Sequence, residues 1–144
     1  MHRVFIDGKE GTTGLRIHER LAARADVALI SLPEEERKDP EARRRALNGC
    51  DVAILCLPDA AAIEAVAMIE NPDVRVIDAS TAHRTASGWV YGFPELTDDG
   101  FTRLKSAKRV AVPGCHAGGY VALVAPLAAA GILKSDALLS CTSV

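Results

Sequence analysis

The sequence has few aromatic residues, which make up 4% of its 144 positions. It also has no surplus of basic charge, because 17 basic and 19 acidic residues leave a formal net charge of -2. Proteins that bind nucleic acids usually carry clustered positive charge, and those that bind single strands add aromatic side chains on which bases stack. We therefore expect no nucleic-acid partner.

Hydrophobic runs suited to a membrane are missing as well. The longest stretch without Asp, Glu, Lys or Arg, residues 110–133, is long enough to cross a bilayer, but Pro113, Gly114 and Pro126 fit a strand, turn and helix better. Residues 1–9 form a charged segment without the apolar core of a secretory signal. These features predict a cytoplasmic protein with no membrane partner.

Cysteine pairs with metal-binding spacing are also absent. The four cysteines form no C-x-x-C motif, so we expect no metal site. A cytoplasmic protein keeps its thiols reduced, and we therefore expect no disulfide bonds. The cysteines are Cys50, Cys56, Cys115 and Cys141.

What the sequence does contain is 49% hydrophobic residues, enough for a substantial core. Short apolar runs predict strands at residues 3–6, 27–32, 52–57, 74–77 and 109–112, and helical patterns fall at residues 12–23, 40–47, 60–69 and about 116–130. Strands separated by helices form right-handed βαβ units. We therefore predict an α/β fold, doubly wound, with a mainly parallel sheet and helices on both faces.

Three local features refine this prediction. Asp59 is expected to cap the third helix, and Pro126 is expected to interrupt or kink the last one. The periodicity of the first helix predicts that its buried residues are Leu15, Ile17, Leu21 and Ala22.

Residues 79–108 break the alternation, and we interpret them as a long ordered loop with short elements, of the kind that often carries function. At the end of the chain, residues 140–144 have the pattern of a strand with no partner in the sequence. We therefore predict one domain over residues 1–134 and the first strand of a second, α+β domain over residues 135–144.

A glycine-rich turn follows the first strand and opens the first helix. It has the spacing G-x-x-G-x-x-G, from Gly8 through Gly11 to Gly14. Glycines at such a turn let the backbone approach a pyrophosphate closely, and the helix N-terminus presents free N–H groups and the positive end of its dipole. The turn favours dinucleotide binding in a Rossmann-like domain, and the alternative is a strand–helix turn that merely needs glycine.

The end of the second strand bears on which nucleotide is bound. NAD-binding domains usually place Asp or Glu there, for the ribose hydroxyls. This sequence has Ser31 or Leu32 at that position, with Arg37 and Lys38 shortly after, and a hydroxyl with nearby cations suits the 2′-phosphate of NADP. The three glutamates Glu34–Glu36 leave open the alternative that this segment is a solvated loop.

Cys115 lies between a predicted strand and a predicted helix, directly after Pro113 and Gly114. Backbone amides and the helix dipole at such a position stabilise a thiolate, and ligands of open parallel sheets bind at the edge where the strands end. We therefore predict that Cys115 is a nucleophile and that the other three cysteines are packing residues.

A nicotinamide cofactor beside a nucleophilic cysteine indicates one type of reaction. The thiolate attacks an activated acyl group to form a thioester, and hydride from the reduced cofactor takes the acyl group to an aldehyde. Such a reaction also needs a general acid or base near the sulfur and a site for the anionic leaving group.

Five segments, in this order, resemble N-acetyl-gamma-glutamyl-phosphate reductases of the shorter type, a family within the semialdehyde dehydrogenase superfamily. They are the glycine turn, Leu57-Pro58-Asp59, Asp78-Ala79-Ser80-Thr81-Ala82-His83-Arg84, Tyr91-Gly92-Phe93-Pro94-Glu95-Leu96 and Pro113-Gly114-Cys115-His116. The resemblance runs through essentially the whole chain. It implies the NADPH-dependent reduction of N-acetyl-glutamyl 5-phosphate, an acyl phosphate, to the 5-semialdehyde, a step of arginine biosynthesis.

The resemblance also implies roles for individual residues. Cys115 is the nucleophile, and the residues around the cofactor phosphates are Gly8, Gly11, Thr12, Thr13 and Gly14. Those near the adenosine end are Ser31, Arg37 and Lys38. Ser80 and Arg84 are candidates for lining the substrate cleft, with Arg84 contacting an anion or, alternatively, pinning the long loop. His116 does not align with the family's catalytic histidine and is given no such role.

Members of this family are considerably longer, and their second domain supplies the catalytic histidine, much of the substrate pocket and the oligomer interface. The resemblance therefore implies a truncated chain that binds NADP but reduces substrate poorly or not at all, from a protein that is a homo-oligomer when complete. Two alternatives stay open. One is a relative that acts on an aspartyl or N-acetyl-aminoadipyl substrate, although aspartyl enzymes typically place Asn where Gly114 precedes the cysteine; the other is a non-catalytic NADP-binding module.

Overall fold

The computed structural model describes residues 1–134 and 136–140. Its strands are β1 (His2–Asp7), β2 (Val27–Ile30), β3 (Val52–Leu55), β4 (Arg75–Asp78), β5 (Val90–Tyr91) and β6 (Arg109–Ala111). Its helices are α1 (Thr12–Ala22), α2 (Pro40–Gly49), α3 (Asp59–Ala67), α4 (Gly100–Ser106) and α5 (Cys115–Ala129), with short 3-10 helices η1 (Glu34–Glu36) and η2 (Pro94–Leu96). The elements follow the predicted alternation of strands and helices.

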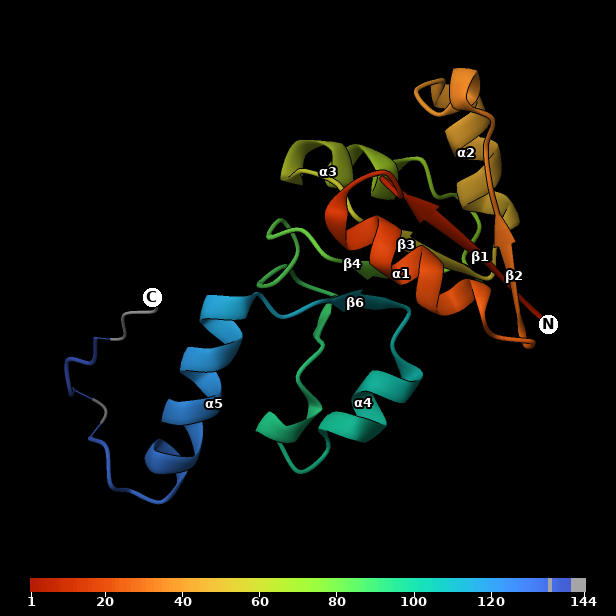
Figure 1. Ribbon diagram of the computed structural model, residues 1–144. Helices are drawn as coiled ribbons and strands as arrows, with labels where there is room; N and C mark the ends of the chain where they lie inside the picture. The colour runs from red at the N-terminus through yellow and green to blue at the C-terminus, as the bar shows by residue number, and fades with distance from the viewer. Residues whose placement is uncertain (135, 141–144) are drawn as a thin grey trace.

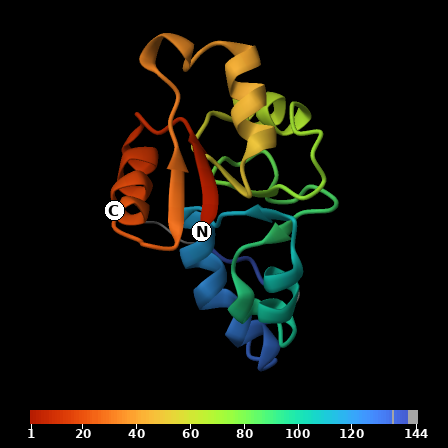
Figure 2. The same ribbon diagram turned by 90° about the vertical axis from the view of Figure 1, so that its right-hand side faces the viewer.

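The strands form one six-stranded sheet in the order β2-β1-β3-β4-β6-β5. Every neighbouring pair is parallel, so all the strands end at the same edge. Figures 1 and 2 show α1 on one face of the sheet and α2 with α3 on the other. The predicted doubly wound α/β fold is confirmed.

Alternate residues of the central strands divide the core between the two faces. Phe5, Ala53 and Val76 face α2 and α3 and belong to the larger buried cluster. Val4 and Ile54 face the other way and pack with residues of α1 in a smaller cluster. Because both faces are covered, the central strands are apolar on both sides, as the sequence indicated.

The first helix differs from the prediction in its buried residues. Ile17 and Leu21 pack against the core as expected, but Leu15 is 50% exposed and Ala22 is also exposed. Gly14 is the buried residue of α1, because it lies directly against the backbone of the preceding turn. The apolar stripe of α1 is therefore narrower than the periodicity suggested.

The predicted long loop contains β5, η2 and α4, which the sequence did not identify individually. β5 joins the sheet as an edge strand beside β6, and its two residues are too few to leave a sequence pattern. η2 and α4 pack together, with the carbonyl of Pro94 in the space that a side chain at Gly100 would need. The loop is ordered, as predicted.

α5 leaves the sheet at Cys115 and carries no buried residue (Figure 1). The interruption expected at Pro126 does not occur, and the helix continues to Ala129. A proline so near the helix end removes only one backbone donor, and its carbonyl still accepts from the Ala130 N–H at 3.0 Å. Leu123 on this helix is 66% exposed. Among the described residues, no helix is both long and apolar enough to span a bilayer.

Residues 136–140 are in neither a helix nor a strand. Apart from Ser140, the strand predicted at residues 140–144 lies outside the described residues, and so does Cys141. The division into residues 1–134 and 135–144 therefore stays a prediction.

Candidate functional site

The glycine turn between β1 and α1 can exist only with glycine at two positions. Gly8 has φ +83°, and a Cβ there would collide with the carbonyl oxygen of Cys56. A Cβ on Gly14 would collide with the carbonyl oxygen of Gly8. The turn is therefore a tight backbone cradle in which α1 and β3 both approach Gly8.

The start of α1 offers backbone donors to an anion. Gly11 caps the helix without a side chain, and the first intrahelical bond runs from the Leu15 N–H to the Gly11 carbonyl at 2.9 Å. The N–H groups of residues 12–14 have no acceptor among the residues that the structure describes. Such free donors at a helix N-terminus fit a dinucleotide pyrophosphate.

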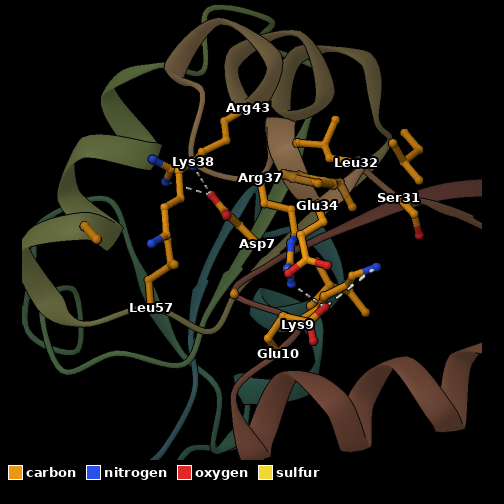
Figure 3. Close-up of a pocket in the computed structure, with 15 residues that line it drawn as sticks. Asp7, Lys9, Glu10, Ser31, Leu32, Glu34, Arg37, Lys38, Arg43 and Leu57 are labelled. Carbon is orange, nitrogen blue, oxygen red and sulfur yellow. Dashed lines mark hydrogen bonds and ion pairs between the residues drawn. The ribbon is translucent and has the colours of Figure 1, made fainter.

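Two adjoining cavities lie along this turn. The larger, of about 680 Å³, is lined by Gly8 and by the residues predicted for the adenosine end, Ser31, Arg37 and Lys38 (Figure 3). The smaller, of about 310 Å³, is lined by Gly11, Thr12, Thr13 and Gly14, together with Cys56, Leu57 and Ala79. Leu57 lines both, and the eight predicted cofactor residues all line one or the other of these two neighbouring cavities.

The charges of the larger cavity are mostly paired with one another. Arg37 binds Glu10 at 2.8 Å and Glu34 at 2.7 Å. Arg43, which the sequence reasoning missed, donates to the buried Asp7 at 2.9 Å. Lys38 forms no ion pair with any described residue, so it is the cation of this cavity with its charge available to a ligand.

Cys115 is the first residue of α5, after the cap residue Gly114, as the sequence predicted. Its side chain is exposed, and its Sγ lies 3.3 Å from Nδ1 of His116. β6 is three strands from β1, about 14 Å at the usual strand spacing, and Cys115 and the glycine turn each follow the end of one of these strands at the same edge of the sheet. The predicted nucleophile and the predicted cofactor turn are thus on the same side of the sheet.

The other described cysteines are packing residues, in agreement with the sequence. Cys50 is fully buried in the larger core cluster, and burial raises the pKa of its thiol to about 11. Burial also raises the pKa of Cys56, and the nearby carboxylates of Asp78 and Asp7 raise it further. Neither thiol is poised to be a nucleophile.

Arg84 reaches the turn that carries Cys115. Its Nε donates to the carbonyl of Val112 at 3.1 Å, and its Nη1 lies 2.5 Å from where a Cβ on Gly114 would stand. Neither terminal nitrogen has a hydrogen-bond partner among the described residues. Arg84 therefore ties the long loop to the sheet, and its terminal nitrogens lie beside Gly114, while its contact with an anion stays a prediction.

Ser80 lies in a buried polar cluster rather than on an open surface. Its hydroxyl donates to Asp78 at 2.6 Å and accepts from the Ala82 N–H at 3.2 Å. Asp78 also binds Nδ1 of the buried His83 at 2.6 Å, and that ring stacks on Trp89 with centroids 4.1 Å apart. The sequence reasoning missed this cluster, although an aspartate at the end of an apolar strand is an available signal.

Asp59 does not cap α3 through its own side chain, contrary to expectation. It is the first residue of the helix, after Pro58, and its carboxylate instead accepts from the N–H and hydroxyl of Thr81. These two hydrogen bonds are the main cause that lowers the pKa of Asp59. The carboxylate thus holds the long loop instead of the helix end.

Comparison with known proteins gives a consistent set of relatives. A family model described as the NAD-binding domain of semialdehyde dehydrogenase matches residues 3–103. N-acetyl-gamma-glutamyl-phosphate reductase 2 of Pseudomonas putida is 59% identical over 133 residues, and the reductase of Burkholderia cenocepacia is 60% identical over the same length. Each alignment covers 92% of this chain and 42% of the relative, so the chain spans about two fifths of the length of these relatives.

Solved structures show the same fold at low sequence identity. Aspartate semialdehyde dehydrogenase from Francisella tularensis has a TM-score of 0.66 at 15% identity, covering 91% of this chain and 42% of that one. The enzyme of the same name from Candida albicans, with NADP, has a TM-score of 0.58 at 16% identity, covering 90% and 47%. These likenesses establish the fold.

Proposed function

The chain belongs to the semialdehyde dehydrogenase family through that family's NAD-binding domain, and from this premise we propose that it is the cofactor-binding, nucleophile-bearing part of an N-acetyl-gamma-glutamyl-phosphate reductase. The proposed reaction reduces N-acetyl-glutamyl 5-phosphate to the 5-semialdehyde, a step of arginine biosynthesis. Identities of 59–60% to reductases of that name support this substrate over an aspartyl one. The observation that carries the proposal is the exposed Cys115 at the same sheet edge as the glycine cradle.

The residues that line the two cavities along the glycine turn fit NADP. Gly8 and Gly14 allow the close backbone approach that a pyrophosphate needs, and the free N–H groups of residues 12–14 would bind its oxygens. Ser31 and Lys38 would bind the 2′-phosphate, while Arg37 stays engaged with its two glutamates. When bound, NADPH supplies the hydride that takes the acyl carbon to the aldehyde level.

Cys115 supplies the covalent step. Its thiolate attacks the acyl carbon, the bond from that carbon to the phosphate oxygen breaks, and phosphate leaves as a thioester forms. Arg84, with two free guanidinium nitrogens beside Gly114, would bind the phosphate as charge develops on it. When the aldehyde is released, the carbon–sulfur bond breaks, the sulfur is the leaving group and the Cys115 thiolate is regenerated.

Other parts of the function belong to the longer protein. We place the general base, most of the substrate pocket and the homo-oligomer interface in the length that the relatives have beyond this chain. The chain alone should therefore bind NADPH but reduce substrate poorly or not at all. A reaction that needs a free thiolate suits the reducing cytoplasm, where we place the protein.

Two measurements on the chain test the proposal. NADPH fluorescence should saturate on titration, and Gly14→Ala should abolish the change. Iodoacetamide near neutral pH, followed by peptide mass spectrometry, should label Cys115 more than tenfold faster than Cys50 or Cys56. Saturable NADPH binding with slow labelling of Cys115 would favour a non-catalytic NADP-binding module, and no binding at all would refute both functions.

A further inference from the structure

The segment that joins β4 to Arg84 is held by carboxylates at both of its sides. Asp78 is completely buried at the end of β4, and it binds Ser80 through the backbone N–H at 2.9 Å and through the hydroxyl. From the other side, Asp59 at the start of α3 binds the N–H and hydroxyl of Thr81. This short segment is therefore fixed both to strand β4 and to helix α3.

His83 adds a third attachment immediately before Arg84. Its ring is buried, its Nδ1 lies 2.6 Å from the Asp78 carboxylate, and its face stacks on Trp89 with the ring planes 13° apart. A ring bonded at its edge and stacked on its face has little freedom to rotate. The backbone at His83 is thus fixed in both position and direction.

Arg84 follows in the same turn, closed by a hydrogen bond from its N–H to the Thr81 carbonyl at 3.4 Å. A flexible side chain on a fixed backbone still needs one more anchor, and the Nε bond to Val112 supplies it. The guanidinium consequently lies against Gly114, one residue from the nucleophile. Val112, the acceptor for Arg84, is itself held to β4 by one hydrogen bond, in which the Val112 N–H donates to the Asp78 carbonyl at 2.8 Å.

We propose that the Asp78–Ser80–His83 cluster is a positioning element that holds the Arg84 guanidinium beside Cys115, and so sets the positive potential at the nucleophile. None of the three residues touches the sulfur, so they act through Arg84. This inference rests on the proposed function, because it assigns to that site the residues that pre-organise its anion-binding cation. Ser80, a predicted cleft residue, is reinterpreted as part of this support.

Alkylation of Cys115 by two reagents of different charge tests the proposal. Iodoacetate is an anion and iodoacetamide is neutral, so the ratio of their rate constants at Cys115 reports the local potential and cancels changes in thiolate content. Loss of a cation several ångströms away should lower the ratio about three- to tenfold. We expect Arg84→Gln to show this loss, and His83→Ala and Ser80→Ala to lower the ratio at least twofold.

The controls separate positioning from folding and from general charge. Arg20→Gln removes an exposed cation at the end of α1 and should leave the ratio unchanged. His83→Asn keeps a donor near the place of Nδ1 and should restore most of the ratio. Far-UV circular dichroism checks that each variant is folded, and if His83→Ala is not, the ratio in Ser80→Ala decides.

The outcomes also distinguish this inference from the proposed function. Unchanged ratios in His83→Ala and Ser80→Ala, with a lowered ratio in Arg84→Gln, would overturn the positioning role and leave the reductase proposal standing. An unchanged ratio in Arg84→Gln would overturn both the positioning role and the anion site assigned to Arg84. Failure of NADPH to bind would count against the proposed function alone.

Discussion

Gly8 in the glycine turn is required for two physical reasons, its positive φ and the lack of space for a side chain. Comparison with two glycines elsewhere in the chain separates the free-energy cost of each. Gly88 has φ +80° with open space around it, so Gly88→Ala adds only backbone strain, about 1–2 kcal/mol. Gly119 has neither a positive φ nor a close neighbour, so Gly119→Ala in α5 should stabilise the chain by about 0.5–1 kcal/mol. Gly8→Ala combines the strain with a collision against the Cys56 carbonyl, which adds about 1–3 kcal/mol.

Urea unfolding followed by far-UV circular dichroism gives the free energy of unfolding of each variant, and NADPH titration gives its affinity. We expect Gly8→Ala to lose about 2–5 kcal/mol and most of its NADPH binding, since the turn must open to admit the methyl group. Gly88→Ala and Gly119→Ala should bind NADPH like the parent chain. Equal destabilisation by Gly8→Ala and Gly88→Ala would refute the reasoning, because the carbonyl would then move aside at no cost.

Three further predictions concern ionisable groups. Burial of the Cys50 thiol raises its pKa from 9.0 to about 11. The thiol therefore stabilises the fold fully below the unfolded pKa of 9.0, and this contribution, about 2–3 kcal/mol, is lost as pH rises through 11; urea midpoints from pH 8 to 11 should fall less in Cys50→Ala. Lys38→Gln should weaken NADPH binding about five- to tenfold with little change for NADH, whereas Lys105→Gln on α4 should affect neither, as fluorescence titrations would show. Arg43→Gln leaves the buried Asp7 carboxylate without its cation and should lower the free energy of unfolding by about 3–5 kcal/mol in urea; a loss below about 1 kcal/mol would show that water replaces the guanidinium.

The features that the sequence predicted correctly depend on residues close together in the chain. The glycine turn and the start of α5 at Cys115 each follow from a short segment in which a strand, a turn and a helix succeed one another. The parallel direction of the strands follows from the helices that connect them in right-handed βαβ units. These inferences needed no knowledge of distant contacts.

The features that the sequence left undetermined join distant residues. The Arg43–Asp7 pair connects α2 with β1, and the Arg84–Val112 bond spans the long loop. The exposure of Leu15 could not be predicted from periodicity either, because it depends on how much of the sheet α1 covers. Long-range side-chain contacts and the exposure of helix residues are set by packing between elements, and the local sequence pattern does not predict them.

The Cys115 sulfur lies at the N-terminal end of the long helix α5. α5 has 15 residues and is about 22 Å long, its start lies against Arg84 at Gly114, and none of its residues is buried. If the axis of α5 tilts by about 10° about its first turn, the C-terminal end of the helix moves about 4 Å, while the Cys115 sulfur moves by well under 1 Å. The position of the Cys115 thiol relative to the Arg84 guanidinium therefore changes little when the C-terminal end of α5 moves.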